Sequence, residues 1–253
     1  MIRHQILLSS SYSEGSRICL DFPDCNQIVF KNAIGSVNDA YDGKRVSFSL
    51  HTIHTDSVEW GSVVEKDPYF DDVHVVETVD EFVKIIQNDR YLKGMDVAKY
   101  ILSKESCTHA RIEGLTFICY ADYLCSSGKR LFEDKIYAYQ HGPVIDSVYQ
   151  TLKKYSKDDP KKWIDDEKML KMDIRIQMRS RILFSEDGEE KMASIDRTLS
   201  KYKGVSTEQL VDLIHQPDSP WQITRSKQSG DQLYQIISDD AIKEHHRFEQ
   251  IGS

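Results

Sequence analysis

Apolar and polar residues alternate along much of residues 1–76, with the period expected of β-strands. Short apolar segments, separated by Ser, Gly, Pro and Asn, predict strands at residues 6–8, 17–22, 27–30, 58–60 and 73–76. The most regular alternation runs from Arg45 to Ile53 and places Phe48 and Leu50 on one face and His51 on the other. Because the His51 face is polar, we expect an antiparallel sheet with one face in water.

A helical period begins near Thr78. Thr78 and Glu81 have the spacing of a capping box, and the apolar residues after them follow one helical face, which predicts a helix that ends at about Asn88. We expect residues 1–92 to form a small, β-rich α+β domain, with its boundary at residues 91–94.

The chain beyond this boundary is mainly helical in its period. Apolar spacing predicts a helix over residues 95–102 and a second from His109 to about Ser126, capped by Thr108 and ended by Gly128. The second helix is apolar nearly all round, which is typical of a helix at the centre of a domain.

Residues 131–149 predict a strand that turns sharply into a helix. Ile136 and Ala138 alternate with polar neighbours, as in a half-buried strand. Gly142 supplies backbone freedom at the turn, and Pro143 fixes φ where a helix would begin. Helical spacing of apolar residues follows, so we expect a corner that anchors the domain.

The remaining pattern completes the predicted architecture. Helices are predicted over residues 186–202, 206–214 and 238–248, and a short alternating piece over residues 233–237. Residues 173–184 alternate apolar and basic side chains and fit either a strand or a helix. The expected fold class is therefore α+β, with a β-rich N-terminal domain followed, over residues 93–253, by a mainly helical bundle with a small β element.

Charge is distributed unevenly along the 253 residues. The formal net charge is −8, and residues 1–92 carry −7 of it, with 8 Lys and Arg against 15 Asp and Glu. An acidic N-terminal part argues against binding to a nucleic-acid backbone. It favours either a basic protein partner or solubility alone.

The apolar runs are short. None approaches about 18 uncharged residues, so a membrane span is excluded. The run at residues 6–8 is too short for a secretory signal, and we therefore expect a cytoplasmic protein.

Metal-binding residue types are present without ligand spacing. The five cysteines form no Cys-x-x-Cys pair, which fits reduced thiols. His51 and His54 lie on opposite faces of the predicted strand, and no carboxylate or cysteine stands at ligand spacing beside them or beside His74. The Asp-rich loop at residues 67–72 lacks the spacing and the glycine of a calcium loop. We expect no metal site and no cofactor.

No catalytic motif is present either. The sequence lacks a Gly-rich phosphate loop, a His-Glu-x-x-His helix and a Gly-x-Ser-x-Gly elbow. An enzyme would have to use Asp122, Glu133, Asp134 and His141, with Asp122 and His141 meeting across the helix–strand junction. Such carboxylate–histidine pairs are often structural, so we expect no catalytic activity.

Several segments in order resemble one known family. They are the helix VAKYIL at 97–102, LTFICYADYL at 115–124, GKRLFED at 128–134, AYQHGPV at 138–144, and LVDLIH at 210–215 with Ser219-Pro220-Trp221. This succession resembles the Panacea domain, the GepA/SocA-like phage-associated antitoxin family, over about residues 93–248. One departure is at Arg111–Leu115, where the family usually carries a Leu-Gln-Lys-Leu run.

The resemblance implies a non-catalytic antitoxin of a toxin–antitoxin system, which binds and neutralises a cognate toxin protein. Two alternatives remain open. The protein could be an adaptor that delivers a bound partner to a protease, or a DNA-binding regulator of its own operon. The net negative charge counts against the regulator. One basic concentration, at Arg175, Arg179 and Arg181, favours it or a partner patch, unless these charges only balance nearby acids.

Aromatic residues with polar atoms stand near the breaks in the pattern, and such residues are favoured at the centres of interfaces. We expect partner contacts from Tyr137, Tyr139, His141 and Trp221, and we note Trp163 as a further exposed aromatic residue. A structural role is the competing interpretation for each. In that interpretation Tyr139 and His141 hold the corner, and Trp221 fills the bundle.

Overall fold

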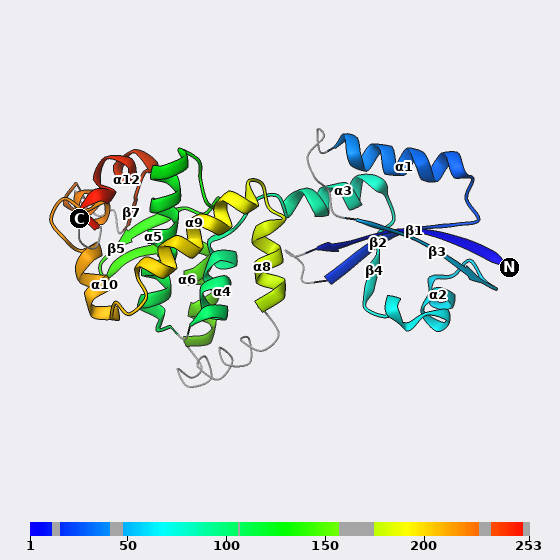
Figure 1. Cartoon of the computed structure of the whole chain (residues 1–253), viewed down its shortest axis with the longest axis horizontal. Coiled ribbons are helices and arrows are strands. Elements are labelled where there is room, and N and C mark those ends of the chain that lie inside the picture. The colour runs from blue at the N-terminus through cyan, green and yellow to red at the C-terminus, as the bar shows by residue number, and fades with distance from the viewer. Residues whose placement is uncertain (12–15, 41–47, 106, 157–174, 228–233, 250–253) are drawn as a thin grey trace. The chain divides into compact units, whose positions relative to one another are not determined.

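The structure is a computed structural model that describes residues 1–11, 16–40, 48–105, 107–156, 175–227 and 234–249 (Figure 1). The chain divides into two compact units, unit 1 over residues 1–90 and unit 2 over residues 91–253. A strand-rich first part is followed by a helical part with a second, smaller sheet. The α+β class is confirmed.

Unit 1 is built on one sheet with the strand order β3-β1-β2-β4. Its strands are β1 (Ile2–Ser11), β2 (Ser16–Pro23), β3 (Ser49–Thr55) and β4 (Val73–Val75). Strand β1 pairs antiparallel with both β2 and β3, whereas β2 and β4 are parallel. Its helices are α1 (Gln27–Asp39), α2 (Trp60–Lys66), the 3-10 turn η1 (Pro68–Phe70) and α3 (Val79–Asn88).

At β1 both faces of this sheet are buried, so the prediction of one wet face is wrong for this strand. Leu7 of β1 packs into a cluster with Val37 of α1 and Phe82 of α3. Ile6 and Leu8 of the same strand point the other way, into a cluster with side chains of α2 and η1. A continuous apolar run such as residues 6–8 is typical of a strand covered on both sides.

Strand β3 alternates as predicted, but its better-covered face is the other one. His51 and Ile53 are half-buried and Thr55 is buried, whereas Leu50 is 52% exposed. The physical reason is that η1 and α2 cover the His51 face: the His51 ring meets that of Phe70, and Ile53 packs against the cluster that contains Val63.

Two segments predicted as strands are helical. Residues 27–30 open α1, because the Asn26 side chain accepts a hydrogen bond from the Ile28 backbone N–H at 2.6 Å and caps the helix. Residues 58–60 lead into α2, which begins at Trp60. In both places a local helix start outweighs the strand propensity of three or four apolar residues.

A buried histidine ties three strands of unit 1 together. The Nδ1 atom of His4 lies 2.7 Å from Asp21 Oδ2, and its Nε2 lies 3.1 Å from Thr55 Oγ1 and 2.9 Å from the Ser57 carbonyl. His4 is fully buried. Burial raises the pKa of the Asp21 carboxyl, although His4 acts in the opposite direction.

Unit 2 is arranged around α5 (His109–Ser127), which is buried along nearly its whole length, as predicted for a central helix. Thr108 caps its start by accepting from the Arg111 N–H, and Gly128 ends it with φ 76°. Helices α4, α9, α10 and α12 all pack against it (Figure 1). The other helices of the unit are α4 (Gly94–Lys104), α6 (Asp146–Ser156), α8 (Arg175–Leu183), α9 (Gly188–Lys201), α10 (Thr207–Ile214), α11 (Pro220–Ser226), α12 (Asp239–His245) and η2 (His246–Glu249).

The predicted strand-to-helix corner is a β-hairpin. Strands β5 (Ile136–Tyr139) and β6 (Gly142–Ile145) pair antiparallel, and β7 (Gln235–Ile236) lies on the other side of β5. Pro143 therefore lies within a strand, and the helix begins only at Asp146.

The proline is compatible with β6 because β6 is an edge strand. Ile145, two residues further and on the same side, donates its N–H away from β5 to the Glu113 carboxylate at 2.9 Å. The ring nitrogen of Pro143 faces the same way, so no hydrogen bond of the hairpin is lost.

The basic segment at residues 173–184 is helical where it is described. Arg181 on α8 is only 2% exposed, and its guanidinium pairs with Asp96 at 3.1 Å and donates to the Tyr91 carbonyl at 2.7 Å. One of the three arginines is thus part of the interior and not of a basic surface patch. Trp163 lies outside the described residues.

Candidate functional site

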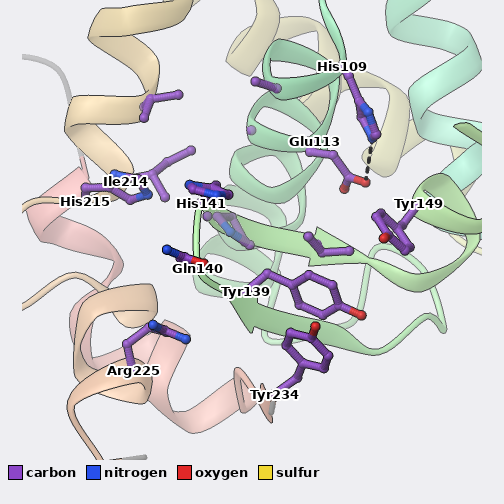
Figure 2. Close-up of a pocket in the computed structure, with 16 residues that line it drawn as sticks. His109, Glu113, Tyr139, Gln140, His141, Tyr149, Ile214, His215, Arg225 and Tyr234 are labelled. Atoms are coloured by element: carbon purple, nitrogen blue, oxygen red, sulfur yellow. Dashed lines mark ion pairs between the residues drawn. The ribbon is translucent and has the colours of Figure 1, made fainter. Parts of the chain in front are cut away.

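A cavity of about 1090 Å³ opens in unit 2 between α5, the β5–β6 hairpin and α10 (Figure 2). Volumes of this order are typical of ligand sites. The described residues that line it are His109, Ala110, Glu113 and Gly114 of α5, Tyr139 to Val144 of the hairpin, Tyr149 of α6, Val211, Ile214 and His215 at α10, Arg225 of α11, and Tyr234.

The hairpin turn forms one wall. Gln140 and His141 are exposed at its tip, and Gly142 follows with φ 138°, a conformation that L side chains rarely adopt. A Cβ at Gly142 would lie 3.8 Å from His215 Nε2. Gly142 therefore provides the backbone conformation that carries Tyr139 and His141 to the cavity.

Helix α5 forms the opposite wall and presents a buried carboxyl. Glu113 Oε2 accepts the Ile145 N–H, whereas its Oε1 has no hydrogen-bond partner among the described residues. Figure 2 shows the His109 ring facing this carboxylate, with His109 Nε2 3.7 Å from Oε1. Burial raises the pKa of the Glu113 carboxyl, although His109 and the Ile145 N–H act in the opposite direction.

Gly114, beside Glu113, lets α10 approach α5 closely. A Cβ there would lie 3.0 Å from Leu210 Cδ2 and 3.1 Å from Ile214 Cδ1. The residue pair Glu113-Gly114 thus sets both the polar floor of the cavity and the position of its α10 wall.

The α10–α11 wall presents a second polar atom. His215 packs against Trp221, with ring centroids 4.0 Å apart at 30°. Its Nε2 is buried and has no hydrogen-bond partner in the described part of the chain. Burial lowers the pKa of His215, although a hydrogen bond to the backbone of His141 acts in the opposite direction.

Three tyrosines form the remaining surface. Tyr139 stacks on Tyr234 with centroids 3.8 Å apart at 15°, and it meets Tyr149 edge to face at 5.5 Å. Figure 2 shows these rings together at one side of the cavity. Burial raises the pKa of Tyr139, and the neighbouring tyrosines raise it further.

The structure places all four sequence-predicted contact residues at or beside this cavity. Tyr139 and His141 line it. Trp221 supports it by donating its Nε1–H to the Tyr139 carbonyl at 2.9 Å, and the Tyr137 ring lies 6.3 Å from that of Tyr139.

Sequence reasoning missed the cavity's polar residues His109, Glu113 and His215, and its aromatic and basic residues Tyr149, Arg225 and Tyr234. Glu113 did leave a signal: it is an acid inside a helix that is apolar nearly all round. Such a charge requires a local partner or an opening.

The residues proposed for an enzyme do not assemble into a site. Asp122 pairs with His246 at 2.7 Å and accepts from Thr198 at 2.7 Å, beside a separate, smaller cavity. Asp134 accepts the backbone N–H groups of Gly94 and Ser147 at the starts of α4 and α6. The Asp122–His141 pair that this hypothesis requires is not formed. Within the described ranges, no cluster of His, Cys, Asp or Glu could hold a metal ion.

Comparison with known proteins finds one family model that matches part of the chain. The family model described as "Antitoxin SocA-like, Panacea domain" matches residues 115–222. This range contains most of α5, the hairpin and α10, whereas His109, Glu113, Arg225 and Tyr234 of the cavity lie outside it. No curated protein and no solved structure matches the chain. Among the helices that the structure describes, none is long and apolar enough to cross a membrane.

Proposed function

We propose that this chain, which carries an antitoxin SocA-like Panacea domain at residues 115–222, is an antitoxin that neutralises a cognate toxin by direct protein–protein binding. The observation that carries the proposal is the position of the cavity. The hairpin and α10, two of its walls, are inside the matched range. The protein acts by binding, without catalysis or a cofactor, in the cytoplasm.

The partner-binding residues in this proposal are Tyr137, Tyr139, His141 and Trp221. His141 is exposed at the hairpin tip, and the three aromatic residues are half-buried around it. Aromatic side chains held in this way lose little conformational entropy on binding, which favours them as anchors of an interface. Strand pairing in the hairpin, and the hydrogen bond from Trp221 to the Tyr139 carbonyl, hold these side chains in place before a partner binds.

Residues 1–92 act as a separate domain that contributes to the choice of partner. Their net charge of −7 would attract a basic partner and disfavour nucleic acid. A toxin with a basic face is the partner that best complements this charge.

The experiment is co-expression with the product of the adjacent gene. We expect that gene alone to arrest growth, and co-expression with the full chain to restore growth and yield a complex on affinity purification. Absence of both rescue and complex would overturn the proposal. The half-life of the partner, measured in the same cells, distinguishes sequestration, which leaves it unchanged or longer, from delivery to a protease, which shortens it.

A variant sharpens this test. His141→Ala should weaken the complex about 30-fold, the equivalent of ~2 kcal/mol for an interface anchor. The matched control is His74→Ala, since His74 is equally exposed but lies on β4, outside the matched range. Equal affinity of the two variants would remove His141 from the interface.

A further inference from the structure

The cavity contains two buried polar atoms that have no hydrogen-bond partner among the described residues. The first is Glu113 Oε1, on a residue only 6% exposed, whose other oxygen is occupied by the Ile145 N–H. Its neighbour His109 lies beyond hydrogen-bond distance, with Nε2 at 3.7 Å from Oε1. The second atom is His215 Nε2.

Buried polar atoms without partners are costly, and their presence beside a cavity indicates a ligand that supplies the missing groups. The Glu113 oxygen favours a ligand with N–H or O–H donors. An anionic group would instead face the Glu113 carboxylate, and an apolar group would leave both polar atoms without a partner.

The rest of the lining favours a flat cation. Tyr139, Tyr149 and Tyr234 gather their rings at one side (Figure 2), and aromatic faces attract cations, above all planar guanidinium groups. Arg225 also lines the cavity and could in principle attract an anionic ligand, but it already has an interaction within the chain.

We propose that the cavity binds a guanidinium group, presented as an arginine side chain by the protein partner. Glu113 Oε1 accepts from its N–H donors, and the tyrosine rings pack against its plane. A guanidinium carries five N–H donors in a rigid plane that stacks on aromatic rings, whereas an ammonium is a compact point charge without such a plane. This inference rests on the proposed function, because it identifies what the partner inserts.

The direct test is calorimetric titration of the full chain with three blocked amino acids: N-acetyl-arginine amide, N-acetyl-citrulline amide and N-acetyl-lysine amide. Citrulline has the shape of arginine but a neutral urea head. We expect the arginine compound to bind at least about tenfold more tightly than either of the others, because hydrogen bonds to charged groups contribute about 1.5 kcal/mol or more. Equal binding of the citrulline compound, or no binding of the arginine compound, would overturn the proposal.

Variants connect binding to this cavity. Glu113→Gln keeps the size of the side chain and an acceptor for the Ile145 N–H but removes the charge, so affinity for the arginine compound should fall at least about tenfold. Glu133→Gln is the matched control, since Glu133 is exposed and is not among the lining residues. A thermal melt of each variant checks that it is folded. Retained affinity in folded Glu113→Gln protein would exclude Glu113 as the site.

Further outcomes distinguish a protein side chain from a free guanidinium compound, and distinguish failure of this inference from failure of the antitoxin proposal. Binding of agmatine, the free decarboxylated arginine, without binding of the blocked arginine would overturn the assignment to a protein side chain. Rescue of growth without arginine binding would overturn this inference alone. Arginine binding without rescue would support the cavity chemistry and overturn the antitoxin function.

Discussion

Two histidines, one from each unit, differ in how their ring nitrogens are paired: His4 is fully buried, and His215 is half-buried. His4 in unit 1 uses both ring nitrogens, with Asp21 on one side and Thr55 and Ser57 on the other. His215 in unit 2 leaves Nε2 without a partner among the described residues, at the edge of a large cavity. Each unit also contains a buried carboxyl, on Asp21 and on Glu113, with one oxygen that has no hydrogen-bond partner within the part of the chain that the structure describes. The difference therefore lies in the two histidines and in the space beside them. His4 stabilises the fold, whereas His215 borders a cavity that a ligand can enter.

The largest expected effect is on stability and concerns His4 of unit 1. His4→Ala should lower the free energy of unfolding by about 3 kcal/mol, because it leaves the Asp21 carboxyl buried without its partner. Urea unfolding measures this change. His54→Ala, at an exposed position of β3, is the control and should stay within about 0.5 kcal/mol of the parent. If His215→Ala cost as much as His4→Ala, the contrast between the two histidines would fail.

The next effect is on the hairpin that carries the cavity. Gly142→Val should cost about 2 kcal/mol, because a β-branched residue is strained at φ 138°. The melting temperature reports this loss. Gly35→Val provides the control, since nothing lies within 4 Å of a Cβ at Gly35 and its φ is not in the positive range. An unchanged melting temperature for Gly142→Val would show that the turn tolerates a side chain.

A smaller effect is expected at the support of the α11 wall. Trp221→Phe removes the Nε1–H that the Tyr139 carbonyl accepts, and it should cost about 1 kcal/mol. Binding of the partner should weaken as well, since Tyr139 loses its restraint. Chemical denaturation gives the first quantity and co-purification the second. A stable variant with full partner binding would assign Trp221 no part in either.

The smallest effect concerns Glu113, beside the cavity of unit 2. Burial raises the folded-state pKa of Glu113 above its unfolded value, so its contribution to stability is present below the unfolded pKa and is lost as pH rises through the folded pKa. The contact with His109 and the Ile145 N–H lower this pKa, and the charge of Asp134 raises it. Glu113→Gln should therefore melt higher than the parent at about pH 8, and this advantage should shrink at about pH 4. A variant less stable than the parent at the higher pH would contradict this sign.

Much of the fold could be predicted because its signals are local. Thr78, Thr108 and Ser206 each start a helix where the capping pattern places it, and Gly128 ends α5 in the left-handed conformation. These residues act through hydrogen bonds that span three or four positions. The residues next to each cap along the chain are therefore enough to predict where the helix begins or ends.

The failures arise where distant residues decide. The residues near Pro143 do not reveal that β6 is an edge strand, where a proline is tolerated. Gly142-Pro143 therefore predicts the start of a helix instead. The cavity likewise joins Glu113 to His215 and Tyr234. Both of these residues lie a hundred or more positions beyond Glu113 along the chain. Tyr139, His141 and Trp221 were found because aromatic residues at chain breaks are a local signal, whereas Glu113 becomes meaningful only once the hairpin lies over it.

The outer edge of β6 has a consequence for how any partner can attach. Exposed strand edges commonly recruit a strand from another protein through their free N–H groups. Along this edge Pro143 has no N–H, and the N–H of Ile145 is already held by Glu113. Backbone pairing, which reads little of a partner's sequence, is thereby closed at these two positions. A protein that docks at the hairpin must be selected by its side chains.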